Sequence, residues 1–478
     1  MKIRSFCGKK RQMTGQMTGG SRPGCGPFAL RMHSMRYLLQ NGGMGMAGDF
    51  IITGGRPLRG TVQIPAAKKS VLPLLAASML CTGRVRLQNV PLLADVSTSR
   101  KLLQSVGCTV RRQGADLLVE SAPSACCPDP EQTAQMRASI LFCAPLLARL
   151  GRVETVLPGG CKIGERPVDL HLSGLERMGA ECRQEGARLI LTAPAGLHGA
   201  AITLGFPSVG ATETLLLAAA TAQGTTVLRG AAREPEIADL AAFLNRCGAC
   251  VRGAGSSTVQ VEGQRRLSGC TFAPMADRIA ASTFACACAA AGGRVELKGC
   301  DPGTYAPLLE ILEQMGCRVE RGSESAVISR IGRLHGTGKV FTGVYPALAT
   351  DAAPLLAAVM LAADSESSIE DVIFERRFGC AAGFAALGGQ ARVSGRCLSI
   401  APCSPQGLKG AAVQAADLRG GAALVIAALA ARGESRVSGT GFIDRGYADL
   451  AAQMACLGAQ MTREMHPGTG ECKKRPSK

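Results

Sequence analysis

The chain has 478 residues, of which 46% are hydrophobic, 19% are charged and 4% are aromatic. This composition excludes a disordered chain and describes a globular protein packed with small and aliphatic side chains. The length exceeds that of one ordinary hydrophobic core, so we expect two or three domains.

The formal net charge of +18 is unevenly distributed along the chain. Residues 1–48 carry eight Lys and Arg and no acid, and the last eight residues add +3, so 18 − 8 − 3 leaves about +7 for the body. That charge suits a small anionic substrate, and the few aromatics argue against nucleic-acid binding. We expect residues 1–48 to be a disordered or misassigned extension, with translation starting at Met44 or Met46, and residues 465–478 to be a disordered basic tail.

The 21 cysteines are scattered through Ala-rich stretches, where Cys packs as a small hydrophobe. Their odd number, without an apolar secretory segment, favours a reducing cytoplasm. Cys286 and Cys288 lack a second pair of ligands, so we expect no zinc site. Because no apolar run is long enough to cross a bilayer, we expect a soluble, cytoplasmic protein with no membrane partner.

The chain contains six copies of one unit. A helix-like stretch ends in a glycine six times, with spacings of 72, 69, 68, 72 and 70 residues, at Gly107, Gly179, Gly248, Gly316, Gly388 and Gly458. Earlier in each unit lies a more apolar helix, as at residues 72–82, 140–150 and 215–223, followed by glycine and a β-branched strand. Helices apolar on nearly every side must be buried, so the pattern predicts compact α/β lobes rather than an open solenoid.

The repeat also aligns polar residues. Six of them stand at the beginning of the apolar helices, at spacings of 69, 71, 70, 73 and 68 residues: Lys68, Arg137, Ser208, Arg278, Asp351 and Arg419. Helix N-termini favour anions, so lobes that face each other through these ends would form an anion site. Ordinary capping is the alternative for Ser208 and Asp351, but it does not account for the basic residues, which the helix dipole disfavours there.

The segment Leu157-Pro-Gly-Gly-Cys161-Lys-Ile-Gly-Glu-Arg166 differs from the other cysteine neighbourhoods. Its glycines predict a hinged loop, and Lys162 with Arg166 would lower the thiol pKa of Cys161. Such a cysteine can donate a proton or form an adduct, although a structural loop cysteine is the alternative. We expect His171, a little further on, to be a structural residue.

Seven stretches of the chain together carry a resemblance to a known family: residues 67–68, 136–139, 157–171, 208–212, 231–236, 416–419 and 443–447. On these stretches, and from about residue 49 to 464, the chain resembles the UDP-N-acetylglucosamine 1-carboxyvinyltransferases of the EPSP synthase-like superfamily. The resemblance implies an α/β fold of two inverse α/β barrel lobes, each of three βαβαββ-type units of about 70 residues. One lobe would comprise residues 68–274, with the cysteine loop, and the other residues 49–67 plus 275–464.

The activity implied by the resemblance is transfer of the enolpyruvyl group of phosphoenolpyruvate to the 3′-hydroxyl of UDP-N-acetylglucosamine, with release of phosphate. This is the first committed step of peptidoglycan precursor synthesis. The resemblance implies no metal or organic cofactor, and we expect a monomer or weak oligomer. Two alternatives are 3-phosphoshikimate 1-carboxyvinyltransferase, which lacks this cysteine loop, and a paralogue that binds nucleotide sugar without this catalysis.

The resemblance also implies roles for individual residues. Lys68, Arg166 and Arg445 match phosphate-binding positions and Arg419 a carboxylate-binding one. Cys161 matches the proton donor, and Asp351 the carboxylate that takes the hydroxyl proton, with Asp417 as an alternative. The remaining substrate-binding positions are Lys69, Arg137, Pro167, Val168, Asp169, Leu170, Ser208, Val209, Gly210, Ile373 and Phe374.

Three positions depart from the family pattern. Lys69 stands where the family usually has Asn, and Ala94 and Phe206 stand where it commonly has Lys. An ammonium group only donates hydrogen bonds, whereas the amide of Asn both donates and accepts. We therefore expect these departures to bear on substrate affinity and turnover.

Overall fold

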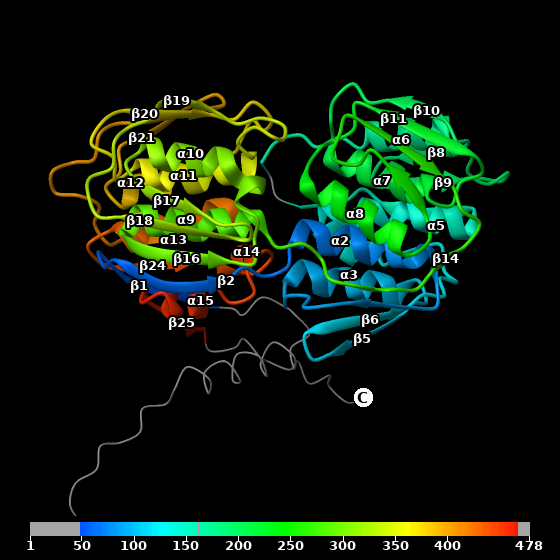
Figure 1. Cartoon of the computed structure of the whole chain (residues 1–478), viewed down its shortest axis with the longest axis horizontal. Coiled ribbons are helices and arrows are strands. Elements are labelled where there is room, and N and C mark those ends of the chain that lie inside the picture. The colour runs from blue at the N-terminus through cyan, green and yellow to red at the C-terminus, as the bar shows by residue number, and fades with distance from the viewer. Residues whose placement is uncertain (1–47, 161–162, 467–478) are drawn as a thin grey trace, which may run out of the picture.

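The computed structural model describes residues 48–160 and 163–466. Figure 1 shows two lobes side by side, each with helices inside and sheets outside. The first lobe has a hydrophobic core built from residues between Val71 and Leu267. The core of the second lobe combines residues from Phe50 to Ile64 with residues from Ile279 to Met461. The chain therefore passes between the lobes twice.

Each lobe carries three main sheets. In the first lobe their strand orders are β15(Thr271–Phe272)-β4(Arg84–Leu87)-β6(Asp116–Glu120)-β5(Thr109–Gln113), β7(Arg152–Val156)-β9(Arg188–Thr192)-β8(Glu181–Glu185) and β10(Ala201–Thr203)-β11(Thr225–Arg229)-β13(Thr258–Glu262)-β12(Cys250–Arg252). A short pair, β14(Leu267–Ser268) and β3(Cys81–Thr82), accompanies them. In the second lobe the orders are β17(Arg318–Arg321)-β18(Ser325–Arg330)-β16(Gly293–Lys298)-β2(Leu58–Gln63), β19(Gly338–Phe341)-β20(Ser367–Glu370)-β22(Cys397–Ile400)-β21(Ala391–Ser394) and β23(Ala412–Gln414)-β24(Gly433–Ser438)-β1(Gly48–Gly54)-β25(Gln460–Met465).

One pairing pattern recurs in these sheets. In five of the six main sheets a first strand lies parallel to the second, and the second pairs antiparallel with a third, as in β10, β11 and the β12–β13 hairpin; the β7-β9-β8 sheet has only the antiparallel pairs. Three sheets complete the pattern with strands from far along the chain: β1 lies between β24 and β25, β2 pairs with β16, and β15 pairs with β4. Six βαβαββ-type units therefore close into two lobes, as expected from the repeat.

The helices fall into two sets. The inner set comprises α2(Lys68–Ala77), α5(Cys143–Leu150), α7(Val209–Ala219), α9(Arg278–Ala291), α11(Ala353–Met360) and α13(Leu418–Ala430). The outer set comprises α3(Ala94–Ser105), α6(Asp169–Arg177), α8(Pro235–Arg246), α10(Ala306–Gln314), α12(Ala381–Ala386) and α15(Leu450–Cys456). Short elements complete the described chain: η1(Ser78–Leu80), α4(Pro130–Gln135), η2(Arg137–Phe142), η3(Pro302–Tyr305), η4(Thr350–Ala352) and α14(Thr440–Ile443).

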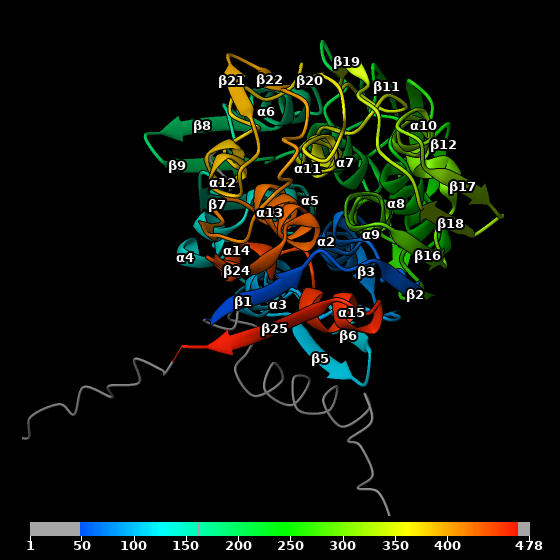
Figure 2. The ribbon, with the colours of Figure 1, turned by 90° about the vertical axis from the view of Figure 1, so that its left-hand side faces the viewer.

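The inner helices are buried because their sequences are apolar on every side. In α9 every residue from Arg278 to Ala290 is buried, and Cys286 and Cys288 are fully enclosed. Ala and Cys side chains are small, so α9, α11 and α13 pack directly against one another, and Figure 2 shows them surrounded by the sheets of the second lobe. The first of these apolar segments was predicted at residues 72–82, whereas α2 covers Lys68–Ala77.

The two crossings between the lobes lie side by side. The backbone of Ala67 donates to Met275 O at 2.7 Å, and that of Asp277 donates to Pro65 O at 2.8 Å. β1 begins at Gly48 and β25 ends at Met465, each one residue within a predicted tail. The other tail residues, 1–47 and 467–478, lie outside the described residues, and the domain boundaries stay a prediction. Within the described part of the chain, no helix has the length and apolarity to cross a bilayer.

Candidate active site

The inner helices bring their first residues to the gap between the lobes, as the repeat predicted. Lys68 begins α2, Arg278 begins α9, and Arg419 is the second residue of α13. Ser208 caps α7 by accepting a hydrogen bond from Ala211 N at 3.3 Å, so the capping interpretation holds for it. It does not hold for Asp351, whose carboxylate forms ion pairs with side chains from both lobes.

A cavity of about 620 Å³ occupies this gap. The predicted site residues that line it are Lys68, Lys69, Arg137, Arg166, Pro167, Asp169, Leu170, Ser208, Val209, Gly210, Asp351, Ile373, Phe374, Arg419 and Arg445. Val168 is not among the lining residues; it is buried, and its carbonyl oxygen accepts from His171 N and Leu172 N at 3.0 Å. Cys161 lies outside the described residues. The nearest described residues before and after it, Gly160 and Ile163, line the cavity.

Two predicted phosphate-binding cations share one carboxylate. Lys68 Nζ lies 3.0 Å from Asp95 Oδ2, and Arg445 Nε of the other lobe lies 2.8 Å from Asp95 Oδ1. Burial alone would raise the pKa of Asp95, but the charges of Lys68 and Arg445 outweigh it and lower that pKa. Asp95 therefore stays ionised and holds the two cations together at the cavity wall.

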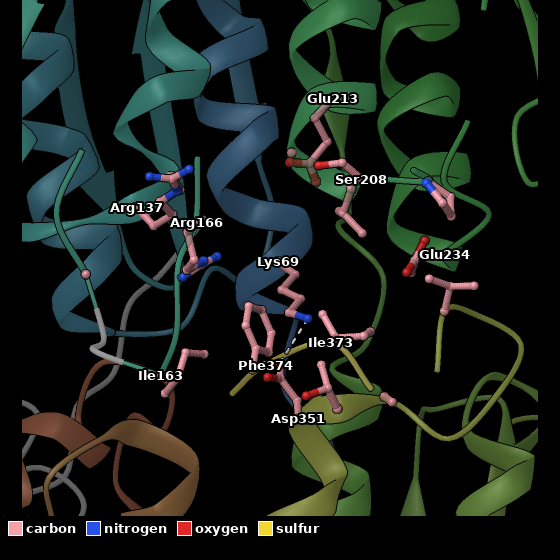
Figure 3. Close-up of a pocket in the computed structure, with 18 of the residues that line it drawn as sticks. Lys69, Arg137, Ile163, Arg166, Ser208, Glu213, Glu234, Asp351, Ile373 and Phe374 are labelled. Atoms are coloured by element: carbon pink, nitrogen blue, oxygen red, sulfur yellow. Dashed lines mark ion pairs between the residues drawn. The ribbon is translucent and has the colours of Figure 1, made fainter. Parts of the chain in front are cut away.

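Asp351 forms ion pairs with three cations. Figure 3 shows the pair with Lys69 as a dashed line. Lys69 Nζ of the first lobe lies 2.9 Å from Asp351 Oδ2, and Arg419 Nε lies 3.8 Å from the same oxygen. Arg377 Nη2 donates to Asp351 Oδ1. Burial opposes ionisation, but the cations, Lys69 foremost, hold the pKa of Asp351 well below its usual range. Asp351 is thus a carboxylate, and a weak base while all three cations stay in place.

Asp417, the alternative base, is engaged in capping α13. Its Oδ1 accepts from the backbone N of Arg419 at 3.0 Å and of Gly420 at 2.9 Å. The guanidinium of Arg419 donates to the buried hydroxyl of Tyr447 at 3.0 Å, which fixes its direction. Asp417 also lines the cavity and the cap uses only its Oδ1, so both Asp351 and Asp417 stay candidates for the base.

A second part of the cavity combines cations with an aromatic ring. The Arg166 guanidinium lies 5.7 Å from the centre of the Phe374 ring, within the range of a cation–π interaction. Arg137 Nη2 donates to Pro167 O at 2.7 Å. Burial and the nearby charge of Arg166 lower the pKa of Arg137 to about 10, so it remains cationic at neutral pH. Asp371, which is fully buried, accepts from the backbone N of Ile373 at 2.9 Å and of Phe374 at 2.8 Å and so positions both.

One ion pair is almost completely enclosed at the edge of the cavity. Arg278 Nε lies 3.0 Å from Glu236 Oε1, with the two side chains only 5% and 2% exposed. It joins α8 of the first lobe to α9 of the second. His171 is buried but also lines the cavity: its Nδ1 lies 2.8 Å from Thr214 Oγ1, burial lowers its pKa to about 4, and its structural role stays a prediction.

Sequence reasoning missed the side chains that hold the predicted residues in place, which are Asp95, Glu236, Arg377 and Tyr447, and the cavity-lining acid Glu213. Asp95 lies in the first turn of α3, where an acid is commonplace, so nothing in the sequence marked it. Glu236, in the first turn of α8, ends stretch 231–236, which carried the resemblance, but its ion pair with Arg278 is visible only in the fold. Tyr447 lies in stretch 443–447, which carried the resemblance, but only the fold shows that its hydroxyl supports Arg419.

The two-lobed fold and its cation-lined cavity define the class of carboxyvinyl transferases. The family model described as EPSP synthase (3-phosphoshikimate 1-carboxyvinyltransferase) matches residues 52–454. Among solved structures, the enolpyruvyl transferase NikO from Streptomyces tendae is 25% identical, with a TM-score of 0.78 over 88% of this chain and 100% of that chain. The EPSP synthase of Acinetobacter baumannii shares the fold at 17% identity, with a TM-score of 0.65 over 88% of this chain and 100% of that chain.

Curated relatives narrow the class. The UDP-N-acetylglucosamine 1-carboxyvinyltransferase of Acidiphilium cryptum (strain JF-5) is 43% identical over 413 residues, covering 86% of this chain and 98% of that relative. The enzyme of the same name from Finegoldia magna (strain ATCC 29328 / DSM 20472 / WAL 2508) is 41% identical, covering 85% and 96%. The chain belongs to the UDP-N-acetylglucosamine 1-carboxyvinyltransferase family.

Proposed function

We propose that this protein transfers the enolpyruvyl group of phosphoenolpyruvate to the 3′-hydroxyl of UDP-N-acetylglucosamine and releases phosphate. The observation that carries the proposal is the cavity between the lobes, where cations from both lobes surround two ionised carboxylates. Membership of the family supports it. In this proposal the reaction takes place in the cytoplasm and supplies the first committed precursor of peptidoglycan.

The cations account for the binding of phosphoenolpyruvate. Lys68 and Arg445 are held together by Asp95 at the wall of the cavity, which suits a phosphate group. Arg419 is buried, and its direction is fixed by Tyr447, which suits the carboxylate. Cations placed in advance in a site with little water stabilise charge that develops on the substrate during reaction.

The nucleotide sugar would occupy the other part of the cavity. α7 begins at Val209, which lines the cavity together with Gly210, and a helix N-terminus favours a diphosphate. Arg137 and Arg166 add positive charge, and the Phe374 ring adds an apolar face. In this proposal the sugar lies between α7 and Asp351.

The reaction then proceeds in two steps. The 3′-oxygen of the sugar bonds to C2 of phosphoenolpyruvate, Asp351 accepts the hydroxyl proton, and Cys161 donates a proton to C3. In the second step a proton leaves C3, the double bond to C2 forms again, and the C2–O bond to phosphate breaks. The role of Cys161 rests on the resemblance. Its described neighbour Ile163 contacts the second lobe, since Arg376 N donates to Ile163 O at 2.9 Å.

The test is a phosphate-release assay on the chain that starts at Met46. Phosphoenolpyruvate is supplied with UDP-N-acetylglucosamine or, in parallel, with shikimate 3-phosphate. Phosphate release with UDP-N-acetylglucosamine, but not with shikimate 3-phosphate, supports the proposal. Release only with shikimate 3-phosphate would assign the chain to the other carboxyvinyl transferase. Binding of UDP-N-acetylglucosamine without release would instead identify a nucleotide-sugar-binding protein.

A further inference from the structure

Glu213 is an enclosed carboxyl group that the proposed chemistry leaves unused. It lies in α7, lines the cavity and is only 5% exposed. A carboxylate enclosed in this way loses most of its hydration, which favours the protonated form. Burial and the neighbouring Glu236 raise the pKa of Glu213 well above its usual value.

Three charged groups act on Glu213: Lys69 of α2, and Glu234 and Glu236 at the N-terminal end of α8. α6, which carries His171, and η2, which carries Arg137, also pack against α7. Glu236 is already paired with Arg278, and Arg137 donates to a carbonyl oxygen. Lys69 is the cation of this set whose charge acts on Glu213 to lower its pKa. A nearby ammonium group can therefore convert Glu213 from a neutral acid into a carboxylate.

Lys69 is the cation best able to move. Its side chain is 37% exposed, whereas the other two cations around Asp351, Arg377 and Arg419, are 2% and 4% exposed. Figure 3 shows Lys69 between the α7 wall that carries Glu213 and the second lobe that carries Asp351. The ion pair of Lys69 with Asp351 occupies the carboxylate that the proposed reaction needs as a base. A hydroxyl group that reaches Asp351 must displace this ammonium group or share its oxygen.

We propose that Lys69 is a positioning residue that alternates between two carboxyl groups: it pairs with Asp351 in the free protein and with Glu213 when the acceptor sugar is bound. This proposal rests on the function proposed above. On binding, the sugar hydroxyl takes the place of the Lys69 ammonium group at Asp351. The ammonium group turns to Glu213, whose carboxyl O–H bond breaks, and the proton passes to solvent water. Asp351 keeps Arg377 and Arg419, but with one cation fewer it becomes a stronger base.

The exchange has a consequence that is independent of turnover. Binding of UDP-N-acetylglucosamine at neutral pH releases a proton from Glu213. Calorimetric titration of the nucleotide sugar, repeated in two buffers with different ionisation enthalpies, measures that release. No phosphoenolpyruvate is needed, so the measurement reports on binding alone.

Three variants make the test specific. Glu213→Gln imitates the neutral acid and should keep the melting temperature of the free protein, but it has no proton to release. Lys69→Met removes the cation that drives ionisation, so its proton release should also disappear. Glu165→Gln, which changes another acid of the same cavity that is not among the charges acting on Glu213, should release as much as the wild type. We expect Glu213→Gln to bind the sugar nucleotide about fivefold more weakly, because the displaced ammonium group loses its second partner.

The proposal is overturned if the wild type releases no proton on binding, or if Glu213→Gln releases as much as the wild type. A wild type that releases phosphate in the assay above but gives either of these results would refute the exchange and leave the proposed function standing. A wild type that binds the sugar nucleotide with proton release, yet never releases phosphate, would support the exchange and refute the function.

Discussion

The enclosed Arg278–Glu236 ion pair gives the sharpest stability prediction. Its side chains are 5% and 2% exposed, and two hydrogen bonds of 3.0 and 3.3 Å join them. Removing one partner of such a pair costs about 3 to 5 kcal/mol, because the other charge is left buried. Glu236→Gln keeps one acceptor oxygen, and Arg278 keeps its position 5.5 Å from the Tyr345 ring centre, so we expect the lower end, about 3 kcal/mol.

Urea unfolding followed by circular dichroism measures this loss. The control is Glu120→Gln, which breaks an ion pair with Arg84 whose side chains are 47% and 64% exposed. An exposed pair contributes less than about 1 kcal/mol, so the control should unfold almost as the wild type does. If Glu236→Gln lost no more stability than Glu120→Gln, the argument from burial would be wrong.

Three further outcomes follow from the site. Lys69→Met removes the charge that does most to lower the pKa of Asp351, so this pKa should rise. The pH profile of kcat/KM reports the free enzyme, and its acid limb should therefore move to higher pH. An unmoved limb would contradict the assignment of Asp351 as the base. Cys161→Ser should lower phosphate release steeply while calorimetry shows UDP-N-acetylglucosamine binding retained, and unchanged turnover would exclude the proton-donor role. His171 has a folded pKa of about 4, below its unfolded value, so its contribution to stability is present at pH 7 and is lost as the pH falls; about 2 kcal/mol should disappear between pH 7 and pH 5. His171→Asn should remove that part of the pH dependence, which denaturation at the two pH values measures.

The fold could be predicted because the sequence pattern that produces each βαβαββ-type unit is repeated along the chain. Gly107 and its five counterparts recur at nearly constant spacing, and each follows a helix whose buried side can be predicted from its hydrophobic residues. The order of the strands was not visible in the same way. β1 lies between β24 and β25, and a pairing over so long a separation leaves no local pattern.

The site could be predicted only in part, for a related reason. The residues at the helix N-termini share a position in the repeat, so Lys68 and Arg419 could be found together. Their partners do not repeat. Asp95 contacts Arg445, which is 350 residues away in the chain, and this contact exists only because the two lobes face each other. The ion pairs between the lobes can therefore be found only from the structure, whereas the cations in them could be predicted from the sequence.

The acids that pair with these cations also set the net charge that this part of the cavity offers to a substrate. Lys68 and Arg445 share Asp95, which leaves a net charge of +1, and three cations share Asp351, which leaves +2. Phosphoenolpyruvate carries a carboxylate and a phosphate, together about −2.5 to −3 at neutral pH. The carboxylates thus reduce the repulsion among closely spaced cations. They leave an excess of positive charge that is close in magnitude to the negative charge of phosphoenolpyruvate. For this reason we expect the acids at Asp95 and Asp351 to matter for donor binding as much as the cations do.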